Sequence, residues 1–212
     1  MQILTDIGHA AIHAGGRCYH LIPSFAAMAR IGTPEEIITT LAVVYGSHYP
    51  QHQITDPTLA KLAVARSYAE TIAAAARVVQ ACCPDDLKSV VGVYSVRSRD
   101  GKLLCKPGMM PHENIITLAR LMMLHGVLGD QPTATDNKKG EYSPRFDARS
   151  WVYLAVAHLG FSEAEAWGMT MTGLRAALAA KYPQEEKKRI PTEEEYNEFM
   201  DIADALMGAD AG

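Results

Sequence analysis

Apolar residues recur at spacings of three and four along most of this chain, which is the pattern of amphipathic helices. The longest run begins after Asp56 and Pro57 and continues to about Cys83, and its apolar stripe contains many small residues that allow close helix packing. The same periodicity predicts shorter helices over residues 25–31, 34–45, 111–125, 148–159, 163–167, 173–181 and 192–206.

Start signals support several of these helices. In a capping box, a Ser or Thr side chain accepts from the third helical N–H, and a Glu at that third position reaches back to the cap. The chain has three such pairs: Thr33 with Glu36, Ser162 with Glu165, and Thr192 with Glu195. Helices are therefore expected to begin just after each of these Ser or Thr residues.

Two segments instead have the pattern of β-hairpins. Gly15 and Gly16 separate two short runs of β-compatible residues, and glycine supplies the positive φ that a two-residue turn needs. Asp100 and Gly101 lie between the runs 90–96 and 102–106 and mark a second turn. The predicted fold is mainly α, a helical domain with two short hairpins, one N-terminal and one central.

The sequence also suggests a division of the chain. Residues 1–129 hold the first hairpin and a helical region with the central hairpin. Residues 130–146 lack periodicity and are rich in Pro, Thr, Asn, Lys and Gly, which predicts a flexible loop. Residues 147–212 form a second helical region that ends in an acidic tail helix.

Composition narrows the function classes. Of 212 residues, 48% are hydrophobic and 21% charged, which is typical of a globular protein, and no apolar run is long enough to span a bilayer. A net charge of −4 argues against a nucleic-acid binder. The absence of a signal-peptide pattern and of paired cysteine motifs predicts a cytoplasmic protein with reduced thiols.

Charge is unevenly distributed. From Pro183 to the end there are nine acidic and three basic residues, whereas the rest of the chain has 15 acidic and 17 basic residues. The acidic end is either a solvated tail or a docking element, and the first is the more common outcome.

Histidine spacing raises a metal hypothesis. His9 and His13, and likewise His48 and His52, are four residues apart, which places two imidazoles on one face of a helix. His9 and His13 lack the intervening glutamate of a metalloprotease helix, and His48 and His52 lie in a predicted loop with Tyr49 and Pro50, which does not fix their geometry. Ordinary surface or half-buried histidines are therefore the favoured interpretation, and we expect no metal and no cofactor.

Nucleophile motifs are equally weak. Cys18 and His20 alternate on a strand and could supply a thiolate and a base, but no third positioning group is visible. Glu35 and Glu36 are paired acids, yet helix capping explains both. The sequence therefore predicts no catalytic residue.

Apolar residues around the short C-terminal helices are candidates for partner contact. Trp167, Met169 and Met171 lie between two of these helices, and the chain contains ten methionines. Methionine surfaces adapt to varied partners, although such residues more often belong to a core.

Two segments carry a resemblance. The hairpin within residues 7–32 leads into Pro23-Ser24-Phe25-Ala-Ala-Met-Ala-Arg-Ile-Gly32, and residues 159–175 combine Leu-Gly, a short acidic helix, an aromatic residue and a Thr-capped helix. Together they resemble the tail assembly chaperones of long-tailed bacteriophages. The resemblance implies a non-catalytic protein that coats the tape-measure protein and recruits tail-tube subunits. It implies partner contacts at Trp167, Met169, Met171, Tyr196 and Phe199.

Other functions remain open. The protein could be a structural tail or connector component that stays in the virion, or a histidine-dependent metal hydrolase. A homo-oligomer is possible in each case.

Overall fold

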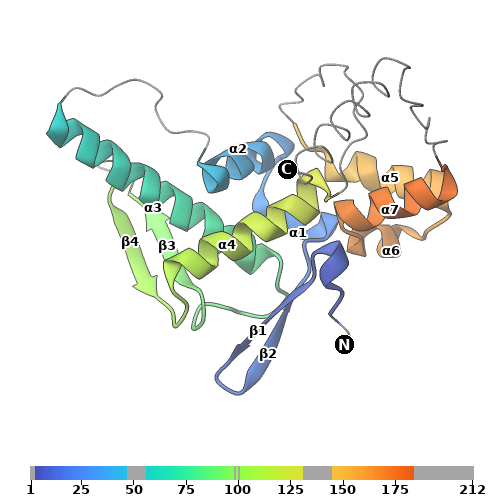
Figure 1. Cartoon of the computed structure of the whole chain (residues 1–212), viewed down its shortest axis with the longest axis horizontal. Coiled ribbons are helices and arrows are strands. Elements are labelled where there is room, and N and C mark those ends of the chain that lie inside the picture. The colour runs from blue at the N-terminus through green and yellow to red at the C-terminus, as the bar shows by residue number, and fades with distance from the viewer. Residues whose placement is uncertain (1–2, 47–55, 98, 100, 131–144, 184–212) are drawn as a thin grey trace, which may run out of the picture. The chain divides into compact units, whose positions relative to one another are not determined.

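The computed structural model describes residues 3–46, 56–97, 99, 101–130 and 145–183 (Figure 1). The chain divides into two compact units, residues 1–181 and 182–212, and the elements below belong to the first. They are η1 (Thr5–Ile7), β1 (Ala10–Ala14), β2 (Arg17–Leu21), α1 (Phe25–Ile31), α2 (Pro34–Tyr45), α3 (Pro57–Ala81), β3 (Gly92–Val96), β4 (Leu103–Pro107), α4 (His112–Met123), η2 (Leu124–Leu128), α5 (Ala148–Leu159), α6 (Glu163–Gly168) and α7 (Met171–Lys181). This arrangement confirms the predicted fold class of helices with two short hairpins.

The first hairpin forms as the Gly-Gly pair predicts. Strands β1 and β2 are antiparallel, and Ala14 pairs with Arg17 across a two-residue turn. Gly15 and Gly16 have φ values of 56° and 73°, a conformation that fits the right-handed twist of the strands and favours glycine. On one face of the hairpin Ile12, Tyr19 and Leu21 are buried, whereas Arg17 next to the turn is exposed.

The central hairpin pairs β3 with β4, antiparallel from Gly92 opposite Pro107 to Val96 opposite Leu103. Beyond the strands, the Arg97 N–H donates to the Lys102 carbonyl at 2.9 Å. Ser98 and Asp100 of the predicted turn lie outside the described residues. This sheet packs against α3, mainly through β3.

The second half of α3 is the centre of the core. Ile72, Ala75, Val78 and Val79 are all 0% exposed. Around them pack α1, α2, α4 and the β3–β4 hairpin. The small side chains of this helix allow that close approach, as its sequence predicts. Four of the methionines also lie in the core: Met28, Met122, Met123 and Met171.

Helix ends follow the capping signals closely. Both capping boxes at α2 and α6 form, with the Glu36 and Glu165 side chains accepting from the cap N–H groups at 2.7 and 2.9 Å. The third box, at Thr192, lies outside the described residues.

One predicted helix is not regular to its end. The pattern over residues 111–125 predicts a single α-helix, but α4 ends at Met123 and continues as the π-helical turn η2 to Leu128. Gly126 lies in this turn, where an added Cβ would come within 2.8 Å of the Met28 sulfur. The widened turn thus brings the backbone against α1.

Residues from both ends of the first unit meet at α1. Ser24 forms a β-bridge with Thr170, and the Phe25 N–H donates to the Met169 carbonyl at 2.9 Å. Helices α5 and α6 pack on α1, so residues 147–181 belong to the same compact unit as residues 1–129. Most of the predicted loop, residues 131–144, lies outside the described residues. No helix in the described part of the chain is long and apolar enough to cross a membrane.

Candidate protein interaction surface

The first half of α3 extends beyond the core and leaves apolar side chains in solvent. Asp56 caps this half by accepting from the Thr58 and Leu59 N–H groups at 2.7 and 3.3 Å. Among residues 57–68, here called the α3 arm, Leu59 is 56% exposed, Leu62 61% and Val64 52%. These are large apolar residues on a well-capped helix, and each of them is more than half exposed.

The α3 arm is apolar on more than one side. Leu59 and Leu62 are three residues apart and share one side, whereas Val64 and Tyr68 are four apart and share another. The second side has a shallow hollow of about 500 Å³, lined by Ala60, Lys61, Val64, Ala65 and Tyr68. A partner can therefore contact the arm along a hollow and around its edge.

Polar and aromatic contacts hold the arm where it joins the body. The Tyr68 hydroxyl lies 2.7 Å from Nδ1 of His112, at the start of α4, and the His112 ring packs edge-on against Tyr94 with centroids 5.2 Å apart. The Tyr94 hydroxyl is buried without a hydrogen-bond partner among the described residues. Desolvation by burial, and secondarily Cys105, raises the pKa of Tyr94. These contacts fix the direction in which the arm leaves the core.

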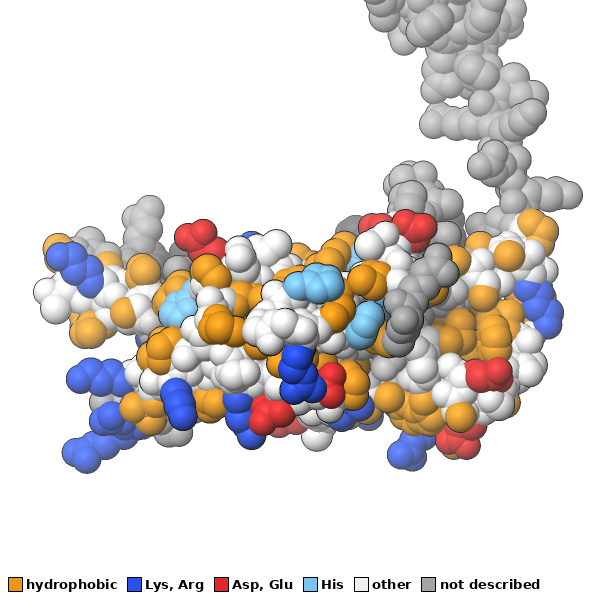
Figure 2. Space-filling view, turned by 90° about the horizontal axis from the view of Figure 1, so that it is seen from below, with side chains coloured by type: hydrophobic (Ala, Val, Ile, Leu, Met, Phe, Trp, Pro, Cys, Tyr) orange, Lys and Arg blue, Asp and Glu red, His pale blue; other side chains and the backbone are white. Residues whose placement is uncertain are grey.

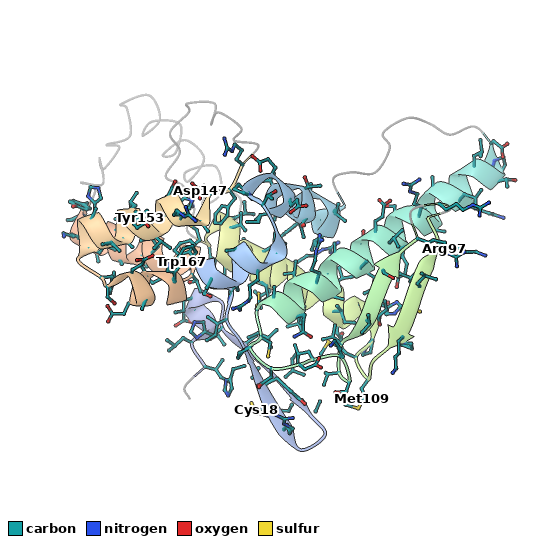
Figure 3. All side chains as sticks on the ribbon, turned by 180° about the vertical axis from the view of Figure 1, so that it is seen from behind. Cys18, Arg97, Met109, Asp147, Tyr153 and Trp167 are labelled. Carbon is teal, nitrogen blue, oxygen red and sulfur yellow. The ribbon has the colours of Figure 1, made fainter. Side chains whose placement is uncertain are left out.

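Two of the residues proposed for partner contact are half-buried near α6. Trp167 lines a hollow of about 310 Å³ between α1, α2 and residues 146–149, and its indole N–H donates to Glu163 at 3.3 Å (Figure 3). The Met169 side chain packs against the core, and its backbone carbonyl accepts a hydrogen bond from the Phe25 N–H at the start of α1. Trp167 is therefore accessible from a concave surface, with part of its ring fixed by the core.

The structure corrects the expectation for Met171. Its side chain is 1% exposed and lies in the core, where it packs near the η2 turn. A partner cannot reach it without opening the fold, so Met171 is a packing residue. Tyr196 and Phe199 lie outside the described residues.

Strand pairing assembles a cluster that the sequence spacing alone did not indicate. Cys18 lies directly opposite His13 across the β1–β2 hairpin, and its Sγ is 3.9 Å from Nε2 of His13 and 3.7 Å from Nε2 of His20 (Figure 3). The two-residue turn at Gly15 and Gly16 determines the register that pairs His13 with Cys18. That turn was therefore the signal in the sequence from which this cluster could have been predicted.

The described histidine pair, His9 and His13, has two different environments. His9 has a buried Nδ1 without a partner among the described residues, and desolvation lowers its pKa, whereas His13 is exposed beside Cys18. His48 and His52 lie outside the described residues. Across residues 3–183, apart from the undescribed gaps, no group of three or more His, Cys, Asp or Glu side chains is placed to hold a metal ion.

The geometry thus defines a mainly helical protein with an exposed apolar helix arm. Comparison with known families adds one finding: a family of unknown function, DUF6246, matches residues 21–198. The chain belongs to this family. Searches of curated proteins and of solved structures found no significant match.

Proposed function

We propose that this protein is a non-catalytic assembly chaperone for the tail of a long-tailed phage or prophage, and that it acts in the host cytoplasm. Its client is the tape-measure protein, and it recruits tail-tube subunits to that client. The observation that carries the proposal is the α3 arm, where Leu59, Leu62 and Val64 are each more than half exposed on a capped helix.

The two segments that resemble tail assembly chaperones support the proposal through their positions. Residues 7–32 and 159–175 are far apart in the chain, yet the Ser24–Thr170 bridge and the packing of α6 on α1 bring them together. Two weak sequence likenesses that form one structural unit are more informative than two isolated ones.

The chemistry of the arm suits reversible covering of a long apolar client. Each large apolar side chain buried on binding contributes about 1.5–3 kcal/mol. A few such residues give a weak contact, and several chaperone copies along one client add avidity without making any single contact permanent. The Trp167 hollow offers a second contact of the same character.

Co-expression with the tape-measure protein encoded in the same genome tests this function. We expect the full chain to co-purify with it, and we expect Leu59→Ser with Leu62→Ser to reduce recovery at least tenfold. The matched control changes two exposed apolar residues outside the arm, Leu128→Ser with Tyr153→Ser, which are 43% and 52% exposed. Equal recovery with both double variants, or no recovery with the unaltered chain, would contradict the proposal.

Mass spectrometry of purified virions separates a chaperone from a structural tail component. A chaperone leaves before the particle is complete, so its peptides should be absent. Detection in a fixed copy number per virion would instead assign the chain to the structural class.

A further inference from the structure

The β3–β4 hairpin has two faces of different character. Strand alternation and the pairing register place Tyr94 and Val96 on the inner side, where β3 packs against α3. The opposite, outer face carries six residues, all of them exposed: Val93, Ser95, Arg97, Lys102, Leu104 and Lys106.

This outer face of β3–β4 is both basic and apolar. Its described residues include three cationic side chains, Arg97, Lys102 and Lys106, and two apolar side chains, Val93 and Leu104, each 45% exposed. Figure 2 shows Lys and Arg side chains gathered at the end of the first unit where α3 and the hairpin lie. Figure 3 shows Arg97 at the turn end of the hairpin. A two-stranded sheet covered on only one side lacks the second layer that usually stabilises sheets.

The same chain contains a segment of complementary chemistry. Residues 191–206 include six carboxylates and no basic residue. Tyr196, Phe199, Ile202 and Leu206 recur at spacings of three and four, which predicts one apolar side of a helix. A helix of that length extends about 24 Å, enough to cross the hairpin, whose five-residue strands each extend about 17 Å.

We propose that the acidic segment 191–206 of one copy docks on the outer face of β3–β4 of a second copy. Its carboxylates pair with Arg97, Lys102 and Lys106, and its apolar side covers Val93 and Leu104. The first unit ends at α7, which packs with η2 and α5 at the opposite end from the hairpin (Figure 1). The contact is therefore head to tail, and it can repeat along a row of copies. This contact between copies uses a different face from the α3 arm, which is the proposed client-binding surface. The inference does not depend on the proposed function.

The apolar residues distinguish this partner from nucleic acid. A phosphate backbone is bound by cationic and polar groups, whereas Val93 and Leu104 in the middle of the basic residues fit an amphipathic helix. The net charge of −4 for the whole chain also disfavours binding to a polyanion.

Sedimentation of the full chain over a range of concentrations tests the contact. We expect the mass to rise with concentration at low salt and to return to that of the monomer at high salt, because exposed ion pairs are screened. Lys102→Glu with Lys106→Glu should abolish association, and so should Glu194→Lys with Glu198→Lys. Reversal of two exposed cations elsewhere, Arg17→Glu with Lys88→Glu, is the matched control and should leave association intact.

Mixing the two non-associating variants gives the decisive result. One retains an intact basic face and the other an intact acidic segment, so an equimolar mixture should form one-to-one complexes although neither variant associates alone. Circular dichroism checks that each variant is folded. If a charge-reversal variant does not fold, the corresponding Lys→Gln or Glu→Gln variant is used in its place. Three results would overturn the proposal. The full chain could stay monomeric at low salt, both variant pairs could leave association unaffected, or the mixture could stay monomeric. Binding of a labelled double-stranded DNA probe that Lys102→Glu with Lys106→Glu abolishes would also overturn it.

Discussion

The two halves of α3 belong to one continuous helix but occupy different environments. In the second half, Ile72 and Val78 are fully buried, whereas in the first half Leu59 and Leu62 are more than half exposed. Both halves have helical apolar periodicity and both are rich in alanine. The second half therefore stabilises the fold through burial, while the first half leaves apolar surface exposed.

The same difference has an energetic consequence. Burial of a large aliphatic side chain is worth about 1.5–3 kcal/mol, and the core half already gains this on folding. The exposed side chains of the arm do not gain it on folding, and under the proposed function they gain it when the client covers them. Changes in the core half should therefore alter stability, and changes in the arm should alter association.

The largest expected difference concerns thiol reactivity. Cys82, which follows the core half of α3, is 1% exposed, and desolvation raises its pKa, whereas Cys18 is exposed on the first hairpin. Labelling of Cys82 requires the fold to open, so we expect it to be at least about a thousandfold slower than labelling of Cys18. Mass spectrometry of the native chain after timed thiol labelling measures both rates. Comparable rates would show that the core half is not closed.

The next effect compares equivalent truncations in the two halves. Ile72→Ala should lower the free energy of unfolding by about 2–5 kcal/mol, because it leaves a cavity in a packed core. Leu62→Ala, at an exposed position, should change it by about 0.5 kcal/mol or less. Denaturant titration followed by circular dichroism gives both values. Similar losses for the two variants would mean that the arm is packed in solution.

A smaller effect is expected at the start of the arm. Asp56→Ala removes the side chain that caps the Thr58 and Leu59 N–H groups, and loss of such a cap costs about 1 kcal/mol. Amide hydrogen exchange should become faster in the first turn of α3 and remain unchanged near Ile72. Asp56→Asn is the control, since asparagine caps equally well. Faster exchange along the whole helix would show that the two halves are not independent.

The smallest effect is expected at the junction of the two halves. Tyr68→Phe keeps the ring and removes the hydroxyl that lies 2.7 Å from Nδ1 of His112. Because Tyr68 is 44% exposed, water replaces much of the lost hydrogen bond, and we expect a stability loss of roughly 0.5 kcal/mol. Thermal melting of the variant beside the unaltered chain measures the loss. A loss as large as that of Ile72→Ala would place the junction inside the core.

Local features of the fold could be predicted from the sequence because their causes are local. The glycine pair at residues 15 and 16 specified the first hairpin, and the pairs Thr33–Glu36 and Ser162–Glu165 specified two helix starts. Each signal acts within a few residues, so no knowledge of the tertiary structure was needed.

Features that depend on packing could not be predicted in the same way. Helical periodicity is the same for a buried stripe and for an exposed one, so the sequence did not show that the α3 arm is uncovered. Met171 was a candidate for partner contact through the resemblance of residues 159–175 to tail assembly chaperones, but the packing of α7 on η2 buries it. The Cys18 cluster required the strand register as well as the spacing.

Site-specific photo-crosslinking tests the central claim most directly, because it asks whether the α3 arm touches the client. A photoreactive phenylalanine is placed at Leu62 or at the exposed control position Tyr153, and each variant is irradiated in cells that also make the tape-measure protein. We expect a covalent adduct with the tape-measure protein from position 62 and little or none from position 153. A complex that forms but yields no adduct from position 62 would contradict it.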